Sequence, residues 1–130
     1  MIVDTSALVA ILKREPGWEA YGRALDTSRR SSISASSYVE LTIVTDGLNN
    51  PTLSRRVDEL IEQFHITVEP FTFEQARVAR QAYRDYGKGS GHPAGLNFGD
   101  CFSYALAREK REPILFKGVG FSKTDLRGAV

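Results

Sequence analysis

The chain has 130 residues, of which 42% are hydrophobic and 25% charged, and its formal net charge is +1. These values are typical of one globular domain and exclude a disordered chain, and the longest aliphatic run, Ala7 to Leu12, is too short to span a membrane. We therefore expect a single domain over residues 1–130. The lone cysteine, Cys101, excludes an internal disulfide, and without a recognisable signal peptide we expect a cytoplasmic location.

The first half of the chain alternates short apolar segments with helical patterns. In chain order it predicts a strand over 1–3, helices over about 4–14 and 18–25, a weak strand over 31–34, and helices over about 36–48 and 51–64. Asp4 ends the first strand and is well suited to begin the helix that follows it, because aspartate is a common N-cap residue.

The second half continues this alternation. It predicts a strand over 66–70, a helix to about Tyr86, a glycine-rich loop over 87–95, a helix from Asn97, a strand over 114–116 and a final turn. Thr72 and Gln75 have the spacing of a capping box at the start of the first of these helices. Strands that alternate with helices predict an α/β/α sandwich around a central, mainly parallel sheet.

Three acids occupy positions where acids are unexpected. Asp4 follows an apolar strand, Glu40 interrupts an apolar helix, and Asp100 lies in the first turn of a helix. In open parallel sheets the functional groups gather beyond the carboxyl ends of the strands, so we expect these carboxylates to meet there. If they were about 5 Å apart, their mutual repulsion would oppose folding by roughly 10 kcal/mol in total, comparable with the stability of a whole domain.

A bound cation would relieve this repulsion. Oxygen ligands without a companion cysteine or histidine cluster favour Mg²⁺, for which Mn²⁺ can substitute. Such an ion keeps coordination positions for water and phosphate oxygens, as a phosphodiester hydrolase requires.

Four segments resemble a known family. They are Met-Ile-Val-Asp-Thr-Ser-Ala-Leu at the start, Ser-Ser-Tyr-Val-Glu ending at Glu40, Leu-Asn-Phe-Gly-Asp-Cys around Asp100, and Leu-Phe-Lys-Gly around Lys117. In this order they are similar to the motifs of PIN-domain ribonucleases, specifically VapC toxins of toxin–antitoxin pairs. The resemblance covers nearly the whole chain.

The resemblance implies a magnesium-dependent endoribonuclease that hydrolyses RNA with water activated by the ion. Asp4, Glu40 and Asp100 match the family's acidic cluster, with Asp4 and Asp100 as the direct metal ligands. It also implies a homodimer and a cognate antitoxin that buries a segment in or beside the active groove.

One position departs from the family pattern. Relatives usually place an acid after the Lys-Gly pair and before a phenylalanine, whereas Val119 and Gly120 stand here before Phe121. The fourth carboxylate is therefore missing, and we expect weakened binding of a second metal ion. Asp125 is near in sequence, but relatives also tend to have an acid there, so it need not be a substitute.

Basic and hydroxyl side chains near these motifs are candidates for substrate binding. Ser6 is close to Asp4 and Lys117 follows the last strand, so both are expected to contact phosphate. Arg84 belongs to a basic stripe that leads into the glycine-rich loop and is interpreted either as an RNA-phosphate track or as a solvated helix face. That stripe consists of Arg77, Arg80, Arg84 and Lys88.

Structural roles remain open for each acid. Asp4 could be only an N-cap, Asp100 a first-turn acid reciprocating with Asn97, and Glu40 the partner of an unseen arginine. Two other functions also stay open: a catalytically weakened module that binds RNA or the antitoxin, as Val119 and Gly120 suggest, and an aspartyl-phosphate enzyme with Asp4 as nucleophile. The second is disfavoured because Ser6 stands where the partner acid is expected.

Overall fold

The computed structural model describes residues 1–130 and contains four strands and six α-helices. The elements are β1 (Ile2–Val3), α1 (Thr5–Lys13), α2 (Trp18–Thr27), β2 (Ser31–Ser34), α3 (Ala35–Asp46), α4 (Pro51–Gln63), β3 (Ile66–Glu69), α5 (Phe73–Tyr86), α6 (Asp100–Lys110), β4 (Ile114–Leu115) and a 3-10 turn at Phe121–Lys123. No helix combines the length and the apolar character needed to cross a bilayer.

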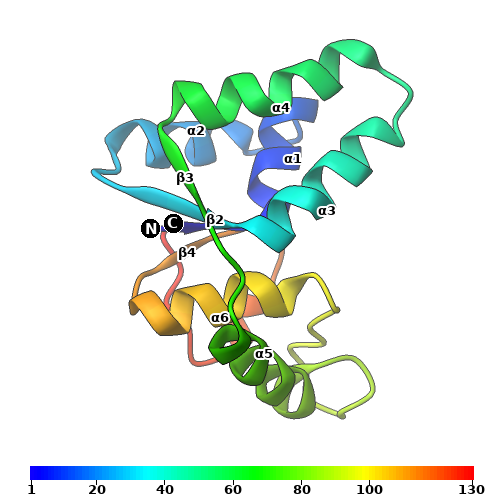
Figure 1. Ribbon diagram of the computed structural model, residues 1–130, viewed down its shortest axis with the longest axis vertical. Coiled ribbons are helices and arrows are strands. Elements are labelled where there is room, and N and C mark those ends of the chain that lie inside the picture. The colour runs from blue at the N-terminus through cyan, green and yellow to red at the C-terminus, as the bar shows by residue number, and fades with distance from the viewer.

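The strands form one parallel sheet in the order β3-β2-β1-β4, with β2 and β1 in the middle and β3 and β4 at the edges. Helices α1 to α4 cover one face, and α5 and α6 cover the other (Figure 1). The predicted α/β/α sandwich with a parallel central sheet is therefore confirmed.

Alternating side chains of β1 and β4 enter the two cores on opposite faces of the sheet. Ile2 and Ile114 pack with α5 and α6, whereas Val3 and Leu115 pack against the helices of the other face. All four side chains are completely buried. Because the strand period is two, each strand of only two residues still contributes to both cores.

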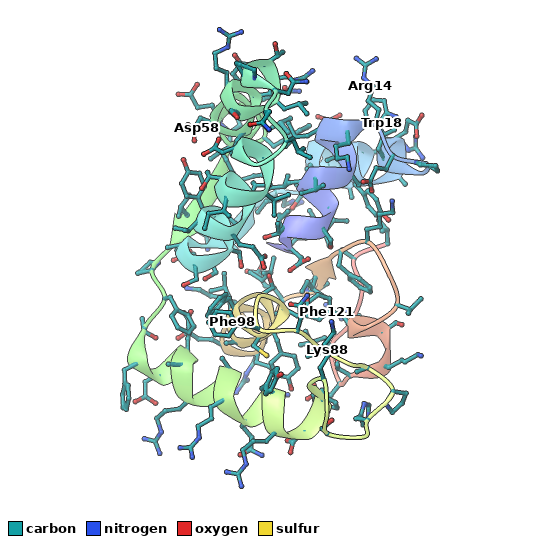
Figure 2. All side chains as sticks on the ribbon, turned by 90° about the vertical axis from the view of Figure 1, so that its right-hand side faces the viewer. Arg14, Trp18, Asp58, Lys88, Phe98 and Phe121 are labelled. Atoms are coloured by element: carbon teal, nitrogen blue, oxygen red, sulfur yellow. The ribbon has the colours of Figure 1, made fainter.

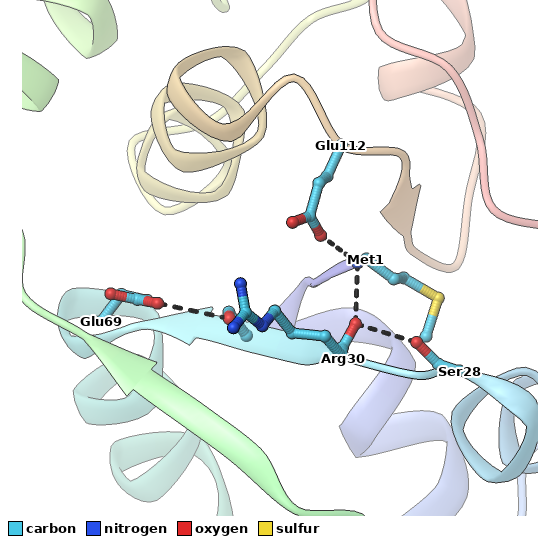
Figure 3. Close-up of polar contacts among 6 residues, drawn as sticks. Met1, Ser28, Arg30, Glu69 and Glu112 are labelled. Atoms are coloured by element: carbon cyan, nitrogen blue, oxygen red, sulfur yellow. Dashed lines mark hydrogen bonds and ion pairs between the residues drawn. The ribbon is translucent and has the colours of Figure 1, made fainter.

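The amino end of β1 is held by polar contacts at the sheet edge opposite to Asp4. The ammonium group of Met1 donates to the carbonyl oxygen of Arg30 at 2.9 Å and pairs with Glu112 (Figure 3). The Ser28 hydroxyl donates to the same carbonyl oxygen at 2.9 Å. These contacts tie the amino end of β1 to the segments that precede β2 and β4.

The predicted elements all form, including the weak strand at Ser31–Ser34, but the predicted capping box is only half made. The Thr72 hydroxyl accepts from the backbone N–H of Gln75 at 3.1 Å, as a cap should. The Gln75 side chain does not reach back; its amide nitrogen donates instead to Glu109 of α6 at 2.8 Å. The tertiary contact with a charged acceptor replaces the local one, since hydrogen bonds to charged groups are stronger.

Candidate active site

Asp4 lies at the carboxyl end of β1, where its carboxylate is almost fully buried and both oxygens have donors. Oδ2 accepts from the backbone N–H of Ser6 at 3.0 Å and from its hydroxyl at 2.6 Å, and Oδ1 accepts from the Ser103 hydroxyl at 2.6 Å. Asp4 is thus the N-cap of α1, but this role does not account for the contact with Ser103 on α6. The carboxylate is fixed in orientation by two different elements.

Asp100 begins α6 and exchanges hydrogen bonds with Asn97. Its N–H donates to the Asn97 side-chain oxygen at 2.8 Å, and the Asn97 N–H donates to Oδ2 of Asp100 at 2.9 Å. The pKa of Asp100 is raised to about 6, mainly by burial and in smaller part by the negative charges of Asp4 and Glu40, while the Asn97 N–H and the charge of Lys88 oppose the shift. The three acids are therefore close enough to interact electrostatically.

Glu40 lies on α3 and is half-buried. Burial raises the pKa of its carboxyl group, the Thr5 hydroxyl opposes this shift, and the charge of Asp4 adds to it. A methyl group at Gly99 would overlap the Glu40 carboxylate, so the backbone of the segment before α6 packs directly on this acid. A larger residue there would require the Glu40 side chain to move.

None of the three acids forms an ion pair. The chain's four ion pairs are Met1–Glu112, Lys13–Glu15, Arg108–Asp125 and Lys117–Glu15. The arginine partner that would have given Glu40 a purely structural role is absent. Positive charge for this cluster must come from outside the chain, or from Lys88 at longer range.

The residues fit a divalent ion that retains much of its water. No group of three His, Cys, Asp or Glu side chains is close enough to enclose an ion. Mg²⁺ is commonly held by one or two carboxylates, with water and substrate phosphates completing its octahedron. The buried, hydrogen-bonded Asp4 and the two acids of raised pKa provide such an open set of oxygen donors.

The three predicted substrate contacts are placed differently. The Ser6 hydroxyl is already engaged, because it donates to Asp4 and accepts from the backbone N–H of Lys117 at 3.0 Å. The Lys117 ammonium group pairs with Glu15 and lowers the pKa of that carboxyl group. Arg84 is exposed on α5 without an ion-pair partner, whereas Lys88, on the glycine-rich loop beside α6, is the stripe residue whose charge acts on Asp100 (Figure 2).

Sequence reasoning missed the hydroxyl groups beneath the acids. Ser103 donates to Asp4, its oxygen lies 3.3 Å from that of Ser37 on α3, and the Thr5 hydroxyl donates to the Ser37 carbonyl oxygen at 3.1 Å. Ser37 and Ser103 are completely buried. A signal was available, since each serine is one helical turn from a predicted site acid and shares its helix face.

The position of the missing fourth acid offers no replacement carboxylate. Val119 is 67% exposed, and a side chain at Gly120 would press on the carbonyl oxygen of Ala94. Asp125 accepts from the Tyr104 hydroxyl at 2.7 Å and from Arg108 at 2.8 Å. Its carboxylate therefore has a structural role between the chain end and α6.

Comparisons with known proteins find relatives over nearly the whole chain. The PIN-domain family model matches residues 1–126. The chain is 55% identical over 130 residues to Ribonuclease VapC28 of Mycobacterium tuberculosis, covering 100% of this chain and 98% of that protein. It is 53% identical over 129 residues to Ribonuclease VapC42 of the same species, covering 99% and 98%.

Solved structures share the fold at low sequence identity. The crystal structure of Mycobacterium tuberculosis VapC20, a sarcin–ricin loop cleaving toxin, superposes with a TM-score of 0.73 at 17% identity and covers 96% of this chain and 95% of that chain. FitAcB from Neisseria gonorrhoeae superposes with a TM-score of 0.71 at 21% identity, covering 98% and 94%.

Proposed function

Since this chain belongs to the PIN-domain family, among the VapC ribonucleases, we propose that it is a divalent-metal-dependent endoribonuclease that acts as the toxin of a toxin–antitoxin pair. The whole chain serves as one nuclease domain. The observation that carries the proposal is the buried carboxylate of Asp4 beside two acids of raised pKa, with no ion pair to any of them.

Asp4 and Asp100 would hold the ion, and Glu40 would orient the attacking water. Bound Mg²⁺ or Mn²⁺ supplies a Lewis acid that polarises the phosphodiester and favours ionisation of water. Glu40 is suited to accept the proton of that water, because burial brings the pKa of its carboxyl group closer to neutral pH. The new bond joins the water oxygen to phosphorus, and the bond from phosphorus to the leaving oxygen of the RNA chain breaks.

The remaining site residues are proposed to position the ion and the RNA. Ser6 acts mainly through Asp4, because its hydroxyl is already bonded to that carboxylate. Lys117 would exchange its contact with Glu15 for a substrate phosphate, and Arg84 is free to meet the RNA backbone farther from the acids. Phosphate contacts of this kind supply affinity without reading sequence.

The proposed protein partners are a cognate antitoxin and a second copy of the chain. Exposed apolar side chains on α3 support an interface, because Val39 is 52% exposed and Ile43 is 66% exposed on the same helix as Glu40. Burial of this face in a homodimer would remove it from water and place two acidic clusters in one assembly.

A catalytically weakened RNA- or antitoxin-binding module is the second candidate. It is favoured by one observation: Val119 and Gly120 occupy the segment of the missing acid, and Asp125 is committed elsewhere. Under this alternative the protein binds RNA but does not turn it over at saturating Mn²⁺.

The test is to sequence the RNA ends that the purified protein produces with added Mn²⁺, beside the Asp4→Asn variant and a sample containing EDTA. We expect defined new ends with the native protein and none in either control. Ends that persist in both controls would contradict the assignment, and binding without any cleavage would favour the second candidate.

A further inference from the structure

An apolar groove of about 290 Å³ lies next to the acidic cluster, between α5 and the start of α6. Its lining is hydrophobic and half aromatic, and its only charged residue is a cation. The residues that matter here are Phe71, Arg80, Tyr83, Phe98, Cys101 and Phe102.

Phe98 joins this groove to the acids. Its ring is 75% exposed and packs edge-to-face on Phe102, with ring centres 4.9 Å apart. The next residue, Gly99, packs directly on the Glu40 carboxylate, and Asp100 follows it. Figure 2 shows Phe98 beside α6, between the two helical layers.

The aromatic rings form a continuous series behind Phe98. Phe102 packs edge-to-face on Phe71 in turn, again with ring centres 4.9 Å apart. This packing holds Phe102, while Phe98 stays largely exposed to solvent. An exposed, supported ring is a good surface for stacking another flat ring.

Charge distinguishes this groove from the larger one on the opposite side of α5. The larger groove, of about 480 Å³, is lined by four carboxylates and one arginine that already pairs with one of them. The carboxylates belong to Glu74, Asp85, Glu109 and Asp125. RNA phosphates are repelled from that surface, whereas Arg80 attracts them to the aromatic groove.

We propose that the groove is a nucleobase site, in which the exposed ring of Phe98 stacks on a base of single-stranded RNA next to the scissile phosphate. Single-stranded bases are typically recognised by stacking on aromatic side chains, and arginine beside such a ring meets the adjoining phosphate. The inference rests on the proposed function and adds to it a site for the substrate base.

The test compares Phe98→Leu with Phe98→Trp and with Phe73→Leu. Phe73 is a matched control because it is 76% exposed, lies on α5 and does not line the groove. Affinity for single-stranded RNA is measured in EDTA with octamers that have one 2-aminopurine, whose fluorescence falls when it stacks. Cleavage of the same RNA is measured with Mn²⁺, and sedimentation gives the oligomeric state of each variant.

We expect Phe98→Leu to weaken RNA binding roughly 5- to 150-fold and to abolish the fluorescence loss, since stacking of one base contributes about 1–3 kcal/mol. Phe98→Trp should retain both, and Phe73→Leu should match the native protein. The loss should appear mainly in KM, because the contact forms before the chemical step.

Three outcomes would overturn the inference. If native protein cleaves RNA and Phe98→Leu binds and cleaves equally well, the base site is wrong and the proposed function stands. If Phe98→Leu only converts a dimer to a monomer of unchanged RNA affinity, the groove is an interface between copies. If native protein neither binds nor cleaves any RNA, the proposed function fails together with this site.

Discussion

Asp4 and Asp100 belong to the same cluster of carboxylates, but their surroundings differ. Asp4 accepts three hydrogen bonds from Ser6 and Ser103, which occupy both of its oxygens. Asp100 accepts only the N–H of Asn97 and stays partly desolvated, so its pKa rises to about 6. The protein stabilises one charge by itself and leaves the other for a cation to stabilise.

This difference is useful for a site that must exchange its ion and substrate. A carboxylate with all its hydrogen bonds satisfied gives a fixed reference point at the end of β1. A carboxylate with few hydrogen bonds in the metal-free protein is stabilised more strongly when the ion binds. Substitutions that affect Asp100 and substitutions that affect the hydrogen bonds of Asp4 should therefore differ in their effects on activity and on stability.

The largest expected effect comes from Asp100→Asn, which removes the less satisfied charge. Ribonuclease activity should fall more than about 100-fold, the upper figure for residues that only support a metal ligand. The metal-free protein should nevertheless become more stable at pH 7, by about 1–2 kcal/mol, because a desolvated charge is gone. Chemical denaturation in EDTA measures the stability, and cleavage rates with Mn²⁺ measure the activity. A destabilised variant would contradict the claim that the Asp100 charge is poorly stabilised without metal.

Gly99→Ala should have the next largest effect, because its methyl group overlaps Glu40. We expect a loss of activity of about 10- to 100-fold, as for residues that orient ligands, with the fold retained. Gly22→Ala is the matched control, since it lies in α2 and a methyl group there meets nothing within 4 Å. Equal activity in the two variants would show that the approach of Gly99 to Glu40 has no function.

Ser103→Ala tests the hydrogen bonds that fix the Asp4 carboxylate. Removing the donor to Oδ1 should lower activity about tenfold and raise the Mn²⁺ concentration needed for half-maximal rate. Ser103→Thr, which keeps the hydroxyl, should recover part of that metal affinity if its methyl group is accommodated. A normal metal titration in Ser103→Ala would mean that Ser6 alone is enough to orient Asp4.

The pH dependence of stability should show the smallest effect. Because the pKa of Asp100 is raised to about 6 in the folded chain, the stability it contributes is fully present below about pH 4 and is lost as pH rises through 6. The loss should be about 2 kcal/mol, less than full linkage gives because Asp100 keeps some contact with water. Denaturation in EDTA between pH 4 and 7 measures it, with Asp100→Asn as the reference and Mg²⁺ expected to remove the effect.

Much of this arrangement was predictable because acids in apolar segments are costly. Glu40 within an apolar helix and Asp4 after an apolar strand stand out for that reason, and the structure brings both near Asp100. Even the weak strand at Ser31–Ser34 was recognisable, since a parallel sheet needs a strand between those helices.

The unpredicted features depend on tertiary contacts that local patterns do not encode. The spacing of Ser103 from Asp100 places it on the site's helix face, but its bond to Asp4, 99 residues away in sequence, depends on how α6 packs against β1. Lys117 likewise finds Glu15 across 102 residues. The Gln75 side chain donates to Glu109 on α6 and does not form the expected local cap, because a charged acceptor lies within reach.

The glycine-rich loop before α6 closes on itself. Gly87 and Leu96 form a bridge, Lys88 N–H donates to the Leu96 carbonyl oxygen at 2.8 Å, and Leu96 N–H donates to the Tyr86 carbonyl oxygen at 2.9 Å. The two ends of the loop are thereby fixed independently of what lies between them. Evolution or engineering can therefore insert residues at the exposed tip, between Gly89 and Gly91, at little cost in loop entropy, which would change the molecules that reach this part of the surface without altering the acidic site.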